Sequence, residues 1–278
     1  MKIKENGKDS QILWHILLVA WVCLTLFPIV FAVCNSFKTN SEAINSVMRL
    51  IPEHPTVENY LSVFRKLPFF RIVMNTFIIA VVVTGLKTVT SLLAAYAFVY
   101  FDFQGKSVLY FAMLMTLFIP FTVTMIPNYL LISRIGYSDH IVGVMLPQLA
   151  DVLGIFMLRQ AMRGINRSLI EAAKLDSIGD IKIMTDIVIP LVRPALVSTG
   201  IIFFINSWNE YVWPVLILKS KQNFTLSLAL QMFISAEGGT NFAMAMAVSV
   251  MTMIIPLILY LFFQRYIINT FVMSGIKG

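Results

Sequence analysis

The chain has 278 residues, of which 58% are hydrophobic and 13% are charged, with a formal net charge of +7 and a mean hydropathy of +0.82. So many apolar residues with so little charge exclude an ordinary soluble globular protein and indicate a protein that crosses the membrane several times. The basic residues are dispersed over the loops, so the positive net charge does not indicate a nucleic-acid partner.

Six long apolar segments account for most of the chain. A bilayer core takes roughly 20 apolar residues per spanning helix, and about six stretches meet that requirement. We predict an all-α, polytopic membrane protein. Its expected spans are Ile12–Val33, Val73–Val99, Val108–Leu131, Ile141–Met162, Ala195–Leu218 and Phe242–Phe263.

Two of these spans have special features. The first is too long for the apolar region of a signal peptide and has no small-residue cleavage site after it, so we expect a retained anchor. The fourth is interrupted by Pro147, Asp151 and Gly154, and we expect it to be broken.

The loop before the fifth span carries the densest charge in the chain. Residues 171–190 hold four carboxylates and two lysines. Ser168 and Glu171 have the spacing of a capping box that starts a helix, and Asp180 can cap a second short helix that Pro190 ends. The second helix has apolar residues on one face, namely Ile181, Met184, Ile187 and Val188.

The loop is therefore expected to form a helical hairpin outside the hydrocarbon. The small residues Ala172 and Ala173 would let another protein surface approach the backbone closely, and charged flanks suit such a contact. A solvated connector in which Glu171 only caps its helix explains the residues equally well.

The hairpin resembles the EAA loop of the membrane subunits of binding-protein-dependent ABC importers. The matching residues are Glu171, Ala172, Ala173, Asp176, Gly179 and Pro190. Two positions depart from the family pattern, because Ser177 replaces the usual Gly and Ile189 the usual Leu. Other segments resemble the maltose-type second membrane subunit: NSFKTN (35–40), ENY (58–60), NTF (75–77), AAYAFVYFDFQGK (94–106), FMLRQAMRGI (156–165), SWNEYVWP (207–214) and QRYIINTFVMSGIKG (264–278).

The resemblance implies a type I importer fold and a permease that forms half of the pathway for a sugar or oligosaccharide. It divides the chain into an anchor and external loop (1–70), a transmembrane domain (71–265) with the EAA loop at 166–190, and a cytoplasmic tail (266–278). The hairpin residues, together with Lys277 in the tail, would contact a separate ATPase. A glycerol-3-phosphate or polyol-phosphate permease is the alternative.

The resemblance also implies partners and a location. These are a second permease subunit in a heterodimer, two ATPase subunits, an extracytoplasmic solute-binding protein and the lipid bilayer of the cell membrane. Both termini would be cytoplasmic, and a modest excess of Lys and Arg on the side of the hairpin agrees with that orientation.

The sequence argues against catalysis in this chain. It contains no G-x-x-x-x-G-K-[ST], so ATP and Mg are expected on the partner ATPase, with no cofactor or metal here. The three histidines have no metal-ligand spacing. A secondary transporter would be expected to show inverted repeats, and none is visible.

Four polar residues within the spans are candidates for the translocation path: Lys87, Asp151, Asn209 and Glu210. Charges in hydrocarbon usually face a bundle interior or a watery path. Lys87 and Asp151 could pair with each other or contact the solute, Asp151 suiting a neutral sugar and Lys87 an anion. Alternatively, Trp208, Tyr211 and Trp213 form an interfacial belt while Asn209 and Glu210 brace helix packing, which we favour for Asn209.

Overall fold

The computed structural model describes residues 6–234 and 241–275, and no β-strand occurs among them, which confirms an all-α protein. Its α-helices are α1 (Asn6–Ser36), α2 (Asn40–Asn45), α3 (Glu58–Lys66), α4 (Phe69–Tyr100), α5 (Lys106–Met115), α6 (Phe121–Arg134), α7 (Ile141–Met145), α8 (Val152–Arg163), α9 (Arg167–Leu175), α10 (Asp180–Ile183), α11 (Ile189–Asn209), α12 (Val212–Ile217), α13 (Leu226–Ile234) and α14 (Phe242–Gly275). Short 3-10 helices cover Thr116–Phe118 and Leu146–Gln148, and a π-helix covers Met184–Val188.

Four helical segments of the described chain are long and apolar enough to cross a membrane, or up to six if each of two bent pairs counts as one span. The four are Gln11–Ser36, Phe69–Tyr100, Asp180–Ile217 and Phe242–Gln264. The prediction of about six spans therefore holds when the bent pairs are included.

The third expected span is not one straight helix. Lys106–Phe118 and Phe121–Arg134 meet at an angle of 98°. Pro120 lies at the corner, and a proline disfavours the helical conformation of the residue before it; Ile119 is extended accordingly. Apolar composition alone does not reveal such a corner, so the prediction of a continuous helix was wrong.

The fourth span is broken as expected. Ile141–Gln148 and Val152–Arg163 meet at 45°, with Pro147 inside the short 3-10 helix and Asp151 at the start of α8.

The fifth span starts earlier than predicted. α10, the π-helix and α11 follow one another directly, so Pro190 does not end a helix. The N–H of Ile189 bonds to the carbonyl of Met184, five residues back, which widens the turn just before the proline that lacks an N–H. At its far end α11 stops at Asn209, and α12 is a separate short helix.

The chain forms two compact units. One comprises Met1–Phe69 with Ala229–Ile254, and the other Phe70–Leu228 with Ile255–Gly278. In the first, Lys38 is fully buried and donates hydrogen bonds to Asn35 Oδ1 at 2.9 Å and to the Ser46 carbonyl at 3.0 Å. Asn59 donates to the carbonyls of Ser36 and Lys38, both at 2.7 Å. The family-like segments NSFKTN and ENY thus hold the first loop together. The division into 1–70, 71–265 and 266–278 stays a prediction.

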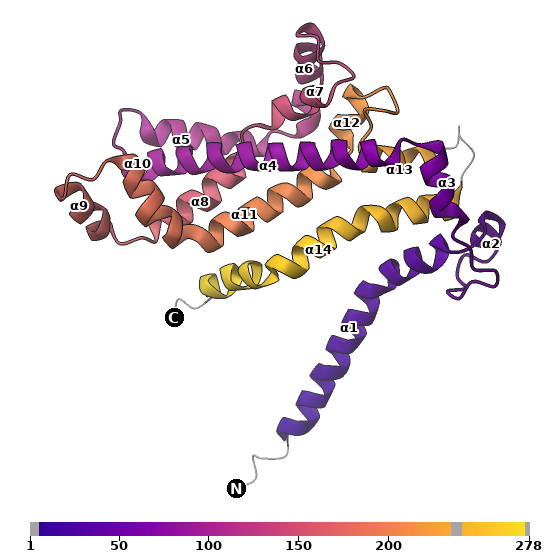
Figure 1. Ribbon diagram of the computed structural model, residues 1–278. Coiled ribbons are helices and arrows are strands. Elements are labelled where there is room, and N and C mark those ends of the chain that lie inside the picture. Colours follow the sequence, from indigo (N-terminus) through magenta and orange to yellow (C-terminus); the bar gives the residue numbers. More distant parts are fainter. Residues whose placement is uncertain (1–5, 235–240, 276–278) are drawn as a thin grey trace. The chain divides into compact units, whose positions relative to one another are not determined.

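In the second unit α8 packs on α11, and α4 runs beside them and shares their core (Figure 1). The hairpin α9–α10 lies at the C-terminal end of α4, and α6, α7 and α12 lie toward its other end. Close packing depends on Gly154, where an added Cβ would stand 2.2 Å from the Phe203 ring and 2.7 Å from Ser91 Oγ.

Candidate coupling hairpin and polar pathway

The helical hairpin at 166–190 is present, but its caps differ from the predicted ones. Asn166 caps α9, its side-chain oxygen accepting from the Ser168 N–H at 3.1 Å. Ser168 and Glu171 already lie inside the helix, so the predicted capping box was wrong. Asn is among the best N-cap residues and comes earlier in the chain, which explains the shift. Gly179, not Asp180, precedes α10, and Asp180 is its first residue.

The turn between the two helices is a Schellman motif centred on Ser177. The Ile178 N–H bonds to the Ala173 carbonyl at 3.1 Å and the Ser177 N–H to the Lys174 carbonyl at 3.0 Å. Ser177 has φ +57°, the left-handed conformation that the usual family glycine adopts freely. The departure from the family pattern therefore leaves the turn in place and adds backbone strain at this position.

We expect Ser177→Gly to stabilise the hairpin by about 1 kcal/mol, because glycine avoids the left-handed penalty of a side chain. Hydrogen exchange of the backbone amides at positions 177 and 178 should be slower in the variant than in the native chain. Gly179→Ala is the control: an added Cβ there meets nothing within 4 Å and the backbone is ordinary extended, so exchange of these amides should stay the same. Equal exchange rates in Ser177→Gly and the native chain would contradict the strain at Ser177.

One face of the hairpin is buried against the helix bundle. Ile170, Ala173, Ile183 and Val188 join a core to which the ends of α4, α8 and α11 also contribute, with Leu92, Ala95, Tyr96, Leu158, Met162 and Val192. Ala173 is only 5% exposed, so it packs inside the chain. A bulky residue at Ala173 would therefore disrupt the hairpin itself, and the position does not test contact with a partner.

The opposite face of the hairpin is open. Glu171, Ala172 and Asp176 are exposed, and two large apolar side chains at the tip are almost fully so, Leu175 at 86% and Ile181 at 77%. Ile181 had been predicted to share one apolar face with Met184, Ile187 and Val188. Ile183 is fully buried in the core instead, so the predicted face is wrong at Ile181.

Besides this apolar packing, one tyrosine of α4 forms hydrogen bonds to the hairpin. The Tyr96 hydroxyl donates to the Asp180 carbonyl at 3.2 Å and lies 3.3 Å from Asp180 Oδ1. Lys174 Nζ is 3.9 Å from the same carboxylate, so α9 and α10 are linked across the turn. Movement of the hairpin tip would accordingly reach α4 as well as α11.

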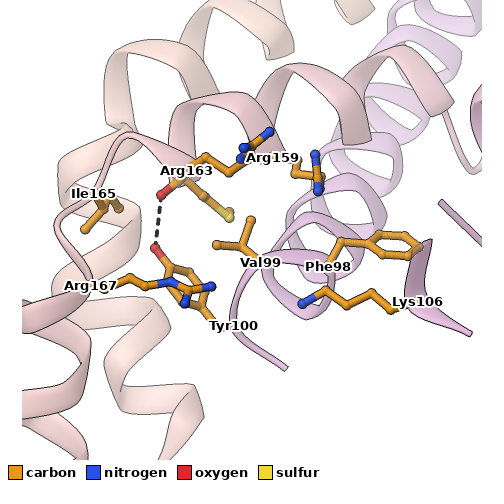
Figure 2. Close-up of a pocket in the computed structure, with 9 residues that line it drawn as sticks. Phe98, Val99, Tyr100, Lys106, Arg159, Arg163, Ile165 and Arg167 are labelled. Atoms are coloured by element: carbon orange, nitrogen blue, oxygen red, sulfur yellow. Dashed lines mark hydrogen bonds between the residues drawn. The ribbon is translucent and has the colours of Figure 1, made fainter. Parts of the chain in front are cut away.

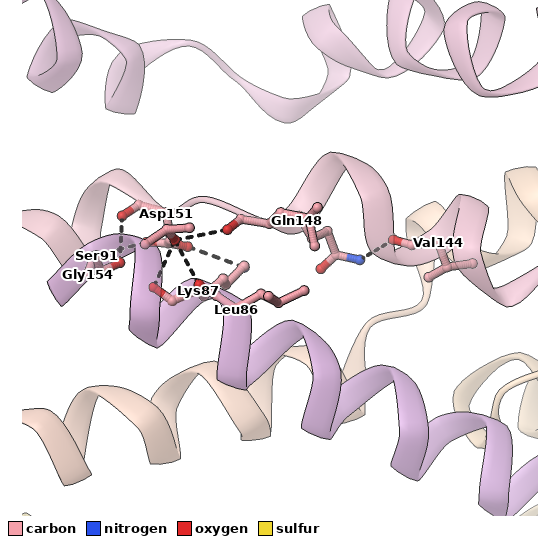
Figure 3. Close-up of polar contacts among 9 residues, drawn as sticks. Leu86, Lys87, Ser91, Val144, Gln148, Asp151 and Gly154 are labelled. Atoms are coloured by element: carbon pink, nitrogen blue, oxygen red, sulfur yellow. Dashed lines mark hydrogen bonds and ion pairs between the residues drawn. The ribbon is translucent and has the colours of Figure 1, made fainter. Parts of the chain in front are cut away.

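The two charges expected in the middle of the bundle do meet. Lys87 on α4 pairs with Asp151 at the start of α8, Nζ to Oδ2 3.3 Å, and their side chains are 13% and 26% exposed (Figure 3). Lys87 Nζ also lies 5.5 Å from the centre of the Phe203 ring, within the range of a cation–π contact. The sequence left open whether Lys87 and Asp151 pair with each other or contact the solute, and the structure shows them paired.

Asp151 has a second task at the break in the fourth span. Its Oδ1 accepts from the Gly154 N–H at 3.0 Å and so caps α8. On the α4 side, Thr90 Oγ1 donates to the Leu149 carbonyl at 2.9 Å and Ser91 Oγ reaches the Asp151 carbonyl at 3.4 Å. Side chains of α4 thus satisfy backbone groups that the broken helix leaves free.

Lys87 also faces a polar cavity of about 500 Å³, which brings together residues from α4, the break in the fourth span and the end of α11. Lys87, Asn209 and Glu210 were predicted as path residues and line it; Asp151 contributes through its pair with Lys87. The full lining is Lys87, Gln148, Asn206, Ser207, Asn209, Glu210, Tyr211 and Val212. Gln148 and Asn206 were missed, although Asn206 precedes Asn209 by three residues and so shares its helix face.

The aromatic residues beside this cavity are mostly structural. Trp208 is fully buried and Trp213 is 2% exposed, so they cannot form the interfacial belt considered above. Trp213 donates its ring N–H to the Gly143 carbonyl at 3.2 Å, and its backbone N–H bonds to Glu210 Oε1, also at 3.2 Å. Glu210 therefore braces the start of α12 while lining the cavity, and Tyr211 lines it too.

A loop carboxylate that sequence reasoning missed organises the far end of this unit. Asp139 Oδ1 accepts from the backbone N–H groups of Lys219 and Ser220 at 2.8 and 2.9 Å, and its carbonyl accepts from Asn223. Partial burial alone would raise the pKa of Asp139, but the hydrogen bonds from Ser220, Lys219 and Asn223 outweigh it and hold that pKa well below its usual range.

Lys277 lies outside the described residues. Among the residues that are described, no group of three or more His, Cys, Asp or Glu side chains could hold a metal ion.

Comparison with known proteins identifies the class. Residues 87–269 match the family described as binding-protein-dependent transport system inner membrane component, and the chain belongs to this family. It is a permease subunit of an ABC importer and not itself an enzyme; the ATPase activity of such importers is on a separate subunit. It is thus a membrane protein that works with a solute-binding protein.

Individual relatives cover nearly the whole chain. It is 30% identical to the arabinooligosaccharides transport system permease protein of Halalkalibacterium halodurans, over 98% of this chain and 99% of the relative. It is 31% identical to the sn-glycerol-3-phosphate transport system permease protein of Yersinia pestis, over 97% and 99%. A crystal structure of a bacterial ABC transporter that imports the acidic polysaccharide alginate matches with a TM-score of 0.79 at 24% identity, covering 96% of this chain and 99% of that one. The type I importer fold is thereby confirmed.

Proposed function

We propose that this permease admits a neutral sugar or oligosaccharide through the cavity beside Lys87, and that the hairpin 166–190 couples it to an ATPase. The proposed assembly is a heterodimer with a second permease, two ATPase subunits that bind ATP and Mg, and an extracytoplasmic solute-binding protein. An alginate transporter structure in complex with a pentasaccharide-bound periplasmic protein, matching with a TM-score of 0.67 at 15% identity, supports the last of these. Both termini would be cytoplasmic.

The exposed hairpin tip carries the coupling proposal. Leu175 and Ile181 both lie at the tip and are 86% and 77% exposed, whereas the opposite face of the hairpin is packed in the bundle. A rigid element with one anchored face and one bare apolar face suits docking into a partner's cleft. Because α10 continues through the π-helix into α11, displacement of the tip would be transmitted to the end that lines the cavity.

The Lys87–Asp151 pair supports a neutral solute. Among the described residues that line the cavity, Lys87 is the only cation, and Asp151 already neutralises it at 3.3 Å. An anionic solute would have to compete with that carboxylate. The amides and aromatic ring that remain, from Gln148, Asn206, Asn209 and Tyr211, suit sugar hydroxyls and ring faces. A polyol-phosphate permease stays the alternative.

The coupling test uses the assembled transporter in proteoliposomes. Leu175→Ser with Ile181→Ser should lower solute-stimulated ATP hydrolysis and uptake at least about tenfold, as expected for loss of two apolar anchors at a docking site. Met48→Ser is the control, because Met48 is also 77% exposed but belongs to the first loop. Full stimulation in the double variant would show that the tip does not contact the ATPase.

The solute test compares uptake of arabino-oligosaccharide and of sn-glycerol 3-phosphate by the same proteoliposomes with the cognate binding protein. We expect uptake of the oligosaccharide. Uptake of glycerol phosphate, with none of the oligosaccharide, would assign the alternative.

A further inference from the structure

A second cavity, of about 460 Å³, lies at the end of the bundle that carries the hairpin and is lined mainly by cations and apolar groups (Figure 2). Its basic residues come from three elements: Lys106 starts α5, Arg159 and Arg163 are on α8, and Arg167 starts α9. Figure 2 shows these four side chains around Val99, with Phe98 and Tyr100 beside it. The Tyr100 hydroxyl donates to the Met162 carbonyl at 3.3 Å.

The three arginines lack the carboxylates that usually accompany them. Within the part of the chain that the structure describes, no carboxylate lies within ion-pair distance of Arg159, Arg163 or Arg167. Lys106 is different, since Asp102 lies 3.4 Å from it and the Phe101 carbonyl accepts from it at 2.6 Å. The cavity therefore has an uncompensated positive charge contributed by arginines.

Arg159 is held as if to receive an acceptor. Its guanidinium stacks on the Tyr110 ring, 3.9 Å from the ring centre, which fixes its plane. Its Nε is buried and has no hydrogen-bond partner among the described residues. A buried donor without a partner is costly, and a planar guanidinium suits the oxygens of a phosphate.

The surroundings of the cavity indicate which phosphate. Phe98, Val99 and Tyr100 are the last residues of a spanning helix, so the cavity lies where hydrocarbon gives way to headgroups. α5 begins beside the same cavity and has exposed apolar side chains: Val108 is 73% exposed and Phe111 is 63% exposed. A ligand with an anionic head and long apolar chains could satisfy both surfaces at once, and basic pockets at the ends of membrane helices favour anionic headgroups.

We propose that this cavity binds the phosphate headgroup of an anionic phospholipid, with the acyl chains lying against α5. The arginines hold the phosphate oxygens, and Val108 and Phe111 contact the chains. The site is distinct from the cavity beside Lys87 and does not depend on the solute. Because Arg167 starts the hairpin helix α9, an occupied site would also tie the base of the hairpin to the membrane surface.

The test is native mass spectrometry of the full-length chain in micelles with equal amounts of phosphatidylglycerol and phosphatidylcholine of the same acyl chains. The native chain should retain phosphatidylglycerol preferentially. Arg163→Gln with Arg167→Gln should reduce that preference at least about tenfold, from about fivefold per basic residue near an anionic headgroup. Both side chains are exposed, so folding should be kept.

Lys182→Gln with Arg193→Gln removes the same charge from exposed positions outside the cavity and should keep the preference. An equal loss in this control, or an unchanged preference in the arginine variant, would overturn the site. Inorganic phosphate added alone separates the two sources of a phosphate: displacement of phosphatidylglycerol by millimolar phosphate would overturn the lipid assignment. Loss of ATPase co-purification in the arginine variant, with lipid preference unchanged, would assign the cavity to a protein partner instead.

Discussion

Asp151→Asn and Lys87→Met are each expected to lower thermal stability and uptake strongly, and the double replacement is expected to recover part of both. Their charges are 3.3 Å apart, with side chains 26% and 13% exposed. Removing one member of a buried pair leaves an unpaired charge and costs on the order of 3–5 kcal/mol; partial exposure of Asp151 places the cost toward the lower figure. Asn retains the cap on the Gly154 N–H, so Asp151→Asn reports mainly on the charge.

The measurements are thermal unfolding of the purified chain and uptake by the reconstituted transporter, read as a double-mutant cycle. Arg65→Met with Glu58→Gln is the control, because this ion pair is 2.8 Å long but 69% and 54% exposed, and its coupling should be within about 0.5 kcal/mol. Additive effects of Asp151→Asn and Lys87→Met would show that the two charges do not stabilise each other.

Gly154→Ala is expected to be strongly destabilising, although it adds only one methyl group. The new Cβ would stand 2.2 Å from the Phe203 ring and 2.7 Å from Ser91 Oγ, and both residues are buried. Neither can move aside, so α8 would have to separate from α4 and α11. Overpacking of this kind costs typically about 1–3 kcal/mol and more where the backbone must shift. The Lys87–Asp151 pair adjoins the same contact, so uptake should fall together with the unfolding temperature.

Gly200→Ala is the matched control for Gly154→Ala. Gly200 lies within α11, and an added Cβ meets only Thr88 Oγ1, at 3.8 Å, which is ordinary contact. Alanine is the better helix former by up to about 1 kcal/mol, so Gly200→Ala should be neutral or slightly stabilising. If both variants unfold at the native temperature, the close approach at Gly154 does not limit the packing of α8.

Long apolar runs made the spans predictable, because burial in hydrocarbon depends on composition over about 20 residues. Their breaks were predictable only where a charge and a proline coincided, as at Pro147 and Asp151. The corner at Pro120 has one proline and no charge, so the apolar run concealed it. At Pro190 the error was the reverse, since a break was predicted where the helix continues. The π-helix that allows this depends on hydrogen-bond geometry that no single residue specifies.

The site was predictable as a set of residues but not as a set of contacts. Lys87 and Asp151 are 64 residues apart in the sequence, and only the packing of α4 on α8 shows that they pair. Glu171, Ala172 and Ala173 are adjacent, yet helical rotation buries Ala173 and exposes the other two. Periodicity alone could not assign these faces, because the hairpin is too short to show which face packs against α4 and α8.

The π-helix at Met184–Val188 makes the aim of the hairpin depend on chain length rather than on side-chain identity. In an α-helix each residue adds about 100° of rotation about the helix axis and 1.5 Å of length along it. Shortening this five-residue segment by one would swing the tip that bears Leu175 and Ile181 by about that angle relative to α11. In relatives of this chain, a one-residue deletion here would therefore change which surface is presented to the partner, whereas substitutions within the segment would leave that direction unchanged.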